Sequence, residues 1–301
     1  MLTPTKELLK SALEGKYALG AFNFVNMEVL EGIIAGAEEA NTPIIVAITE
    51  GAIRYARLDV LAQMAHTLIS KAKIPIALHL DHGRSLSVII EAIKAGFTSV
   101  MIDASDKPFE ENVAITRKVV EIAHSVNVSV EAELGRLEGI EDNIESKEKI
   151  LVNPKKAREF VIKTKVDFLA PAVGTSHGAY KFKGEPRIEI DLIEEVAKLT
   201  HIPLVLHGAS EVPEYLVNEI NTWGGKVKGA KGLPIHELHI AIKAGIAKVN
   251  TDTDLRLAFT AGIRKALGEK PEELDLRKIL GVGREMVKQE VKRRCKALIP
   301  D

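Results

Sequence analysis

Short apolar runs and longer segments of helical periodicity alternate along the whole chain. Runs such as 44–49 (Ile-Ile-Val-Ala-Ile-Thr) are apolar at nearly every position, which is typical of strands buried on both faces. Between such runs, apolar residues recur every three to four positions, as in 27–40, 58–72 and 112–125, which predicts amphipathic helices. We expect strands at residues 18–23, 44–49, 76–80, 99–103, 128–134, 167–172, 204–207 and 248–251.

Proline and glycine support these boundaries. Asn153-Pro154 has the form of a helix N-cap followed by a first-turn proline, and Gly96 and Gly245 stand where helices usually end. Eight strand-then-helix units predict a parallel sheet covered by helices, and eight such units close a (β/α)8 TIM barrel. We therefore expect one α/β barrel domain over residues 1–301, with extra C-terminal helices after Gly268.

An open doubly wound sheet is the structural alternative. No Gly-x-Gly-x-x-Gly follows the first expected strand, which argues against a dinucleotide-binding version of that fold. Two connections, 135–153 and 173–187, are long and rich in Gly, Lys and Glu, and we interpret them as lids or binding loops.

Composition narrows the class of protein. The chain has 301 residues, 46% of them hydrophobic, and a formal net charge of −1, so it has no overall attraction for nucleic acid or anionic membranes. No signal peptide or apolar run of membrane-spanning length is visible, and the single cysteine, Cys295, excludes an intramolecular disulfide framework. We expect a cytoplasmic protein. The basic segment 292–296 is interpreted as a solvated helix face.

Polar residues follow the expected strands at their carboxyl ends. In a barrel these ends form a single rim, so the side chains can reach a common ligand. They are Asp81 and His82 after the third strand, Asp103 after the fourth, Glu131 and Glu133 on the fifth, Gly174–Gly178 after the sixth, His207–Ser210 after the seventh, and Asn250–Asp254 at the eighth.

His82, His177 and His207 form a set of three imidazoles at this rim. Three neutral histidines bind zinc and leave one coordination position open, which is the catalytic arrangement. The alternative is three separate histidines bonded to loop backbone. His66, His124, His201, His236 and His239 lie in helices or at the opposite end of a strand, and we interpret His79 as a core histidine beneath the site.

Asp103 and Glu133 are acidic residues beside this set. They either orient the histidines, bind metal at a second position, or form salt bridges to barrel lysines. Loops six to eight supply glycines and hydroxyl groups suited to phosphate. Lys181 and Arg256 add cations, or are plain surface charges.

Over essentially its whole length the chain resembles the class II, zinc-dependent fructose-1,6-bisphosphate aldolases, in particular their shorter-chain branch. The motifs that carry the resemblance are His79-Leu80-Asp81-His82, Glu131-Ala132-Glu133-Leu134-Gly135, Gly174-Thr175-Ser176-His177-Gly178, Leu206-His207-Gly208-Ala209-Ser210 and Asn250-Thr251-Asp252-Thr253-Asp254.

The resemblance implies a role for each matching position. His82, His177 and His207 would bind the catalytic zinc, and Asp103 and Glu133 would form a second, displaced metal position. Asp81 would be the acid that protonates the aldehyde oxygen during condensation, and Glu141 the mobile base that works on the ketose-phosphate carbon. Substrate would be bound by Asn23, Thr49, Gly178, Lys181, Gly208, Ala209, Ser210, Asn250, Thr251, Asp252, Thr253 and Arg256.

The implied reaction is reversible cleavage of fructose 1,6-bisphosphate to dihydroxyacetone phosphate and glyceraldehyde 3-phosphate, in glycolysis and gluconeogenesis. Zinc would act as a Lewis acid that stabilises an enediolate. Thr49 and Arg256 would lie near the aldehyde phosphate, although serine is expected at position 49. The resemblance also implies a homodimer or homotetramer and is compatible with a monovalent cation near the phosphate loop.

Three rival functions remain open at this point. A tagatose-1,6-bisphosphate aldolase shares the metal motif, and its substrate differs at one stereocentre. A Schiff-base aldolase needs a desolvated lysine inside the barrel, and Lys248 stands toward the start of its strand. A non-catalytic subunit would be expected to lack Asp81, Glu141 or a histidine, and all of these are present.

Overall fold

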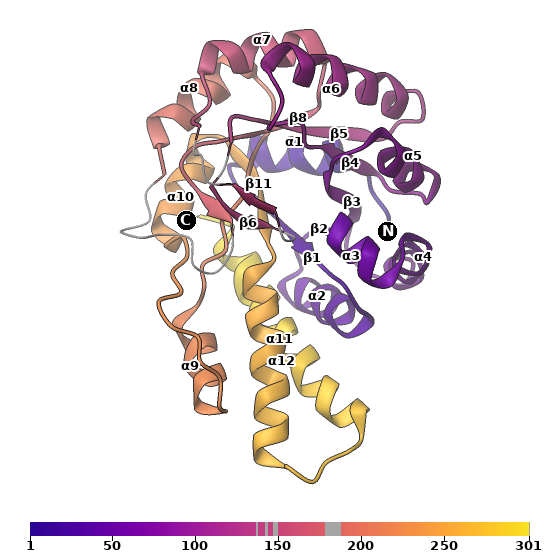
Figure 1. Cartoon of the computed structure of the whole chain (residues 1–301), viewed down its shortest axis with the longest axis vertical. Helices are drawn as coiled ribbons and strands as arrows, with labels where there is room; N and C mark the ends of the chain where they lie inside the picture. Colours follow the sequence, from indigo (N-terminus) through magenta and orange to yellow (C-terminus); the bar gives the residue numbers. More distant parts are fainter. Residues whose placement is uncertain (137, 142–143, 147–149, 178–187, 301) are drawn as a thin grey trace.

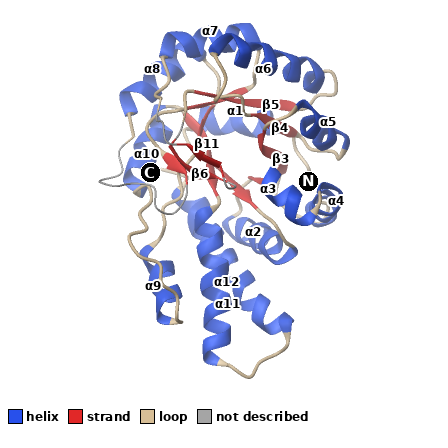
Figure 2. Ribbon diagram, in the orientation of Figure 1, coloured by secondary structure: helices blue, strands red, loops and turns tan. Residues whose placement is uncertain are grey.

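The strands and helices of the chain form a closed barrel. We describe a computed structural model that covers residues 1–300 except 137, 142–143, 147–149 and 178–187; for 138–141, 144–146 and 177 only the backbone is described. Eight parallel strands close in the order β1-β11-β10-β8-β5-β4-β3-β2, with helices around them (Figures 1 and 2). The strands are β1 (Leu19–Asn23), β2 (Ile44–Thr49), β3 (Ile76–Gly83), β4 (Ser99–Ile102), β5 (Ser129–Leu134), β8 (Phe168–Pro171), β10 (Leu204–Leu206) and β11 (Ile246–Thr251).

The eight predicted strands are confirmed, each to within a few residues, and the TIM-barrel prediction is confirmed with them. The strands are mostly apolar because one face of each packs into the barrel interior and the other packs under the helices. The described helices are α1 (Thr5–Gly15), α2 (Met27–Ala40), α3 (Glu50–Ala56), α4 (Leu58–Ile69), α5 (Leu86–Lys94), α6 (Phe109–His124), α7 (Pro154–Thr164), α8 (Ile190–Thr200), α9 (Glu214–Thr222), α10 (Ile235–Ala244), α11 (Thr253–Glu269) and α12 (Leu276–Ala297).

Helix α1 covers the amino-terminal end of the barrel. Its Leu9 and Ala12 join a buried cluster with inward-facing strand residues such as Phe168. The Thr5 hydroxyl lies 2.6 Å from the hydroxyl of Ser99, the first residue of β4. With this end closed, the opposite rim is left for a ligand.

The long connections contain short strands that the hydrophobic pattern did not predict. β6 (Glu138–Glu141), β7 (Ile144–Ser146) and β9 (Ser176–His177) form a separate three-stranded sheet in the order β7-β6-β9. These short strands lie within the connections 135–153 and 173–187, for which we predicted no strand. Their sequences, Glu-Gly-Ile-Glu, Ile-Glu-Ser and Ser-His, are short and mostly polar, so no apolar run marks them.

Helices α11 and α12 form a hairpin that projects from the barrel (Figure 1). α12 packs closely against α2. At Gly36 of α2 there is no room for a side chain, since a Cβ there would lie 2.4 Å from the Lys288 carbonyl oxygen. The interpretation of 292–296 as a solvated face is wrong for two residues: Arg294 and Cys295 are buried. They lie on the side of α12 that packs inward, whereas Lys296 is exposed.

None of the described helices combines the length and the apolar composition that crossing a bilayer requires.

Candidate active site

A backbone irregularity at the end of β3 sets the direction of His82. The register between β3 and β4 shifts between Leu80 and Gly83, and His82 has a φ of 48°. A non-glycine residue in this left-handed region costs conformational energy, and such residues collect at functional sites. The shift brings the His82 ring next to Asp103, which follows β4.

Two imidazoles meet at the rim with their outer nitrogens already occupied. Nδ1 of His82 lies 3.1 Å from Asp103 Oδ2, and Nε2 of His207 lies 2.7 Å from Glu131 Oε1. A carboxylate oxygen only accepts, so each of these nitrogens donates to the carboxylate beside it, and the two rings are held in place. The other two nitrogens, His82 Nε2 and His207 Nδ1, face each other at 2.8 Å, within hydrogen-bond distance.

The carboxylates around the pair are buried and differ in their partners. Asp103 also accepts hydrogen bonds from Arg84 and from the backbone and hydroxyl of Ser105. Burial alone would raise the pKa of Asp103, but the bond from His82 and the charge of Arg84 outweigh it and lower the pKa. Glu133 Oε2 lies 3.9 Å from His207 Nδ1. Ligand atoms of His82, Asp103 and Glu133 lie within 4.8 Å of one another.

Beneath the histidines lies a fully buried ion pair. Glu131 accepts from His207 through one oxygen and from Lys248 Nζ, 2.7 Å away, through the other. Burial alone would raise the pKa of Glu131, but Lys248 and His207 lower it to about 2. His79 lies in the same layer, where burial and the Lys248 charge lower its pKa to about 3 and keep the ring neutral.

Asp81 is held from two sides by amides. Asn23 Nδ2 donates to Oδ2 at 3.0 Å, and Asn250 Nδ2 donates to Oδ1 at 3.1 Å. Burial would raise the pKa of Asp81, but the positive groups around it, His82 and Lys248 foremost, lower it below its usual range. Asp81 is therefore a carboxylate that can accept a proton from a substrate hydroxyl beside the histidine pair.

The predicted phosphate residues after β10 and β11 lie at the same rim. Gly208 has a φ of 62°, and a Cβ there would meet the Ser176 carbonyl oxygen at 2.4 Å, so only glycine fits this close approach. Ala209 and Ser210 are buried. The buried Thr251 hydroxyl has no hydrogen-bond partner among the described residues.

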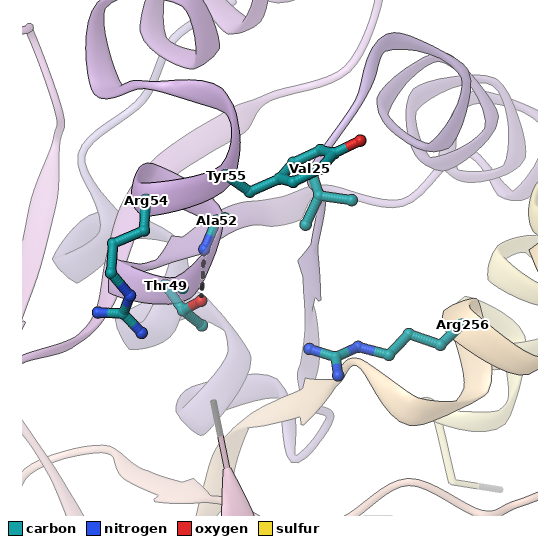
Figure 3. Close-up of a pocket in the computed structure, with 7 residues that line it drawn as sticks. Val25, Thr49, Ala52, Arg54, Tyr55 and Arg256 are labelled. Carbon is teal, nitrogen blue, oxygen red and sulfur yellow. Dashed lines mark hydrogen bonds between the residues drawn. The ribbon is translucent and has the colours of Figure 1, made fainter. Parts of the chain in front are cut away.

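A cavity of about 500 Å³ is lined by residues that include Thr49, Arg54, Tyr55 and Arg256. Thr49, opposite Asp81 in the β2–β3 register, lines this cavity and accepts a hydrogen bond from Ala52 N as the N-cap of α3. Arg54 of α3 and Arg256 of α11 also line this cavity (Figure 3). Arg256 forms a two-bond ion pair with Asp252, one turn earlier. Two guanidinium groups and a hydroxyl suit an anionic end of a ligand.

Comparisons with known proteins place the chain among aldolases. The family model described as "Fructose-bisphosphate aldolase class-II" matches residues 3–299. A fructose-bisphosphate aldolase of Helicobacter pylori is 50% identical over 301 residues, covering 99% of this chain and 98% of the relative. That of Thermus caldophilus is 50% identical over 296 residues, covering 98% and 97%. The solved YdjI aldolase of Escherichia coli K12 superposes with a TM-score of 0.82 at 31% identity, covering 99% and 97%.

The chain belongs to the class II fructose-bisphosphate aldolase family.

Membership in this family implies a divalent metal, and the histidine pair fits one. The facing nitrogens of the two imidazoles lie 2.8 Å apart, and the carboxylates of Asp81, Asp103 and Glu133 are grouped with them within metal-binding range. Imidazole and carboxylate are ligands of zinc and of several other divalent metals, so this donor set agrees with a metal without naming it.

Four of the predicted site residues fall partly or wholly outside the description. Gly178 and Lys181 lie outside the described residues. His177 is placed by its backbone alone, at the end of β9 beside β6, and Glu141 by its backbone at the end of β6. Their side chains are not described, so the roles given to them stay predictions.

The remaining histidines lie away from the rim. His66 and His239 reach backbone carbonyls, His124 pairs with Asp167, His201 ends α8 and His236 is exposed on α10.

From the sequence we did not identify the basic residues that bind the carboxylates and backbone around the site. Lys248 was considered as a nucleophile, yet its ammonium is bound to Glu131. The signal was available, because Glu131 and Glu133 are two apart on a strand and must point to the same side. Arg84 was not considered although it follows the Asp81-His82-Gly83 motif, and Arg294 was assigned to a solvated helix face.

Proposed function

We propose that this protein is a zinc-dependent aldolase that cleaves fructose 1,6-bisphosphate reversibly to dihydroxyacetone phosphate and glyceraldehyde 3-phosphate. The observation that carries the proposal is the convergence of His82 Nε2 and His207 Nδ1 beside the Asp81 carboxylate. We propose His177 as the third ligand, from its motif and from its place on β9.

The residues at the rim divide the work of the reaction. In the cleavage direction, Asp81 takes the proton from the hydroxyl of the carbon that becomes the aldehyde. Asn23 and Asn250 hold both of its oxygens, which keeps the carboxylate aimed and ionised. Glu141, at the end of β6, would return a proton to the ketose-phosphate carbon. Zinc bound by the histidines would supply Lewis-acid stabilisation of the charge that develops on the ketone oxygen.

The two phosphates of the substrate need two separate sites. We assign the ketose phosphate to the β10 and β11 turns, with Gly208, Ala209, Ser210 and Asn250–Thr253, together with Gly178 and Lys181. We assign the aldehyde phosphate to the cavity between Thr49 and Arg256, whose lining is cationic. Asp103 and Glu133 are close enough to His82 for a second metal position, with Asp103 also orienting His82.

The domain organisation, oligomeric state and cellular role are also proposals. We expect residues 1–301 to act as one catalytic domain, in a cytoplasmic homodimer or homotetramer of glycolysis and gluconeogenesis. A monovalent cation beside the phosphate loop is compatible with the family.

Parallel assays with two substrates test the activity. The zinc-loaded protein is given fructose 1,6-bisphosphate or tagatose 1,6-bisphosphate, and triose phosphate release is followed. We expect fructose 1,6-bisphosphate to be cleaved with the higher kcat/KM. A preference for tagatose 1,6-bisphosphate would overturn the substrate assignment, and cleavage of neither sugar would overturn the proposed function.

A further inference from the structure

The last helix carries a buried arginine beneath the turn that follows β10. Arg294 of α12 is fully buried, and its Nη2 donates to the carbonyl oxygen of Ala209 at 2.6 Å. Its Nη1 lies 3.4 Å from the carboxylate of Glu211, two residues further along the same turn. Arg294 therefore contacts the phosphate turn (residues 208–212) through both main chain and side chain.

Peptide geometry gives this bond a direction. The described chain has no cis peptide bond, so the Ala209–Ser210 peptide is trans and planar. In a trans peptide the carbonyl and the following N–H point in opposite directions. Because Arg294 draws the Ala209 carbonyl toward the outer helix α12, the Ser210 N–H is turned away from that helix.

The far end of the phosphate turn is fixed as well. The buried carboxylate of Asp254 accepts the backbone N–H groups of Glu211 and Val212, at 2.9 and 2.8 Å. Val212 has a φ of 54°, which is unfavourable for a β-branched residue and persists only where the surroundings impose it. Arg293 donates to Glu211 at 2.8 Å. The turn is thus held from both α11 and α12.

Packing alone does not require a charge at position 294. A buried guanidinium is costly unless its donors are satisfied, and an apolar side chain of similar length fills such a space more favourably. The Nε of Arg294 has no hydrogen-bond partner among the described residues. The bonds that Arg294 does make go to the phosphate turn, which points to positioning of that turn.

We propose that Arg294 is a positioning residue for the phosphate of the ketose-phosphate substrate. It holds the Ala209 carbonyl so that the Ser210 N–H and the turn next to His207 face the phosphate. This inference rests on the proposed function, because it takes dihydroxyacetone phosphate as the ligand of the turn.

The test compares two substitutions on the same helix. Arg294→Met removes the charge and the donors but keeps the length of the side chain. Lys292→Met is the matched control, because Lys292 pairs with Glu39 on α2, away from the turn. Binding of dihydroxyacetone phosphate to the zinc-loaded proteins is measured by calorimetry, zinc affinity by chelator competition, and KM and kcat with fructose 1,6-bisphosphate.

We expect Arg294→Met to weaken binding of dihydroxyacetone phosphate roughly tenfold or more, the usual effect of losing a charged hydrogen bond. KM should rise, zinc affinity should hold, and Lys292→Met should match the wild type. Arg294→Lys should recover part of the affinity, because it keeps a charge and a donor. A purely structural role would lower the melting temperature and leave the affinity of the folded, zinc-loaded protein unchanged; that result overturns the proposal.

A second variant decides the case if Arg294→Met does not fold. Glu211→Gln removes the anionic partner of the guanidinium and changes little volume, at a partly exposed position. We expect weaker binding of dihydroxyacetone phosphate, by a smaller factor than for Arg294→Met, and unchanged binding overturns the proposal. If the wild type itself failed to bind dihydroxyacetone phosphate or to cleave the bisphosphate, the proposed function would fall, and this inference with it.

Discussion

At the histidine pair the polar groups are bound to one another and buried, whereas in the cavity between Thr49 and Arg256 the charged groups face water. His207 and Glu131 are almost completely inaccessible, and Lys248 closes the network beneath them. The Arg256 side chain is 61% exposed and leans on a neighbouring carboxylate. Each end of a bisphosphate would therefore meet a different kind of site.

The difference follows from the reaction proposed for each end. The metal end has to stabilise developing charge, which is most effective where groups are fixed in advance and water is excluded. The aldehyde end only has to hold a phosphate, and an arginine can exchange an exposed partner such as Asp252 for that phosphate at little cost. Substitutions at the metal end should therefore have the larger effects.

The largest effect is expected at His207. His207→Ala removes one of the two converging nitrogens, and we expect loss of bound zinc together with a fall in kcat/KM on the order of a thousandfold or more. Metal content by elemental analysis and cleavage kinetics check this. His124→Ala, on the exposed end of α6, is the control and should keep both. A His207→Ala protein that retained metal and turnover would contradict the ligand assignment.

Glu131 should have the next largest effect. Glu131→Gln weakens the acceptor that holds the His207 ring in place, and we expect zinc affinity to fall by about 10- to 100-fold, as for other partners of metal ligands. The measurement is chelator competition.

Removing Glu131 also leaves the Lys248 charge buried without its ion pair, which is strongly destabilising. The double variant Glu131→Gln/Lys248→Met separates the two effects. It should regain stability against urea relative to Glu131→Gln without regaining zinc affinity. Full zinc affinity in the double variant would mean that Glu131 does not orient His207.

At the exposed end the effect should be smaller. Arg256→Ala should raise KM for fructose 1,6-bisphosphate about tenfold, the usual effect of losing a charged hydrogen bond, and change zinc affinity little. Arg117→Ala is a matched control, because Arg117 forms the same kind of one-turn ion pair with Glu121 on the outer helix α6. Steady-state kinetics on both variants measure KM. An unchanged KM for Arg256→Ala would contradict the assignment of Arg256 to the phosphate site.

The smallest effect is expected at Thr49. Thr49→Ser keeps the hydroxyl that caps α3 and faces the cavity, so we expect the free energy of unfolding to change by less than about 0.5 kcal/mol and KM to stay close to the wild type. Thr49→Val, which removes the cap, should lose about 1 kcal/mol of stability. Urea unfolding and kinetics measure both. Equal stability of the two variants would contradict the capping role.

The fold and the identity of the rim residues could be predicted from the sequence because they depend on local pattern. Buried parallel strands are apolar at nearly every position, and the residues at their carboxyl ends gather at one rim of the barrel. Asp81, His82 and His207 could therefore be placed on the same edge. The short strands β6, β7 and β9 have no apolar pattern and were missed.

The contacts behind the rim depend on long-range packing. Arg294 lies more than eighty residues from Ala209 along the chain, and it reaches that residue only because α12 packs beneath the turn after β10. The pattern of a basic helix face could not reveal this. Lys248 and Glu131 are likewise 117 residues apart, and only the closed barrel brings them together.

Metal removal tests most directly the claim that the histidine pair binds the ion on which cleavage depends. The purified protein is stripped with a chelator, assayed with fructose 1,6-bisphosphate, and then titrated with zinc. We predict that cleavage is lost on stripping and returns as zinc is restored to the His82–His207 pair. Cleavage that survives exhaustive chelation, with a substrate adduct on Lys248 trapped by borohydride, would contradict the account.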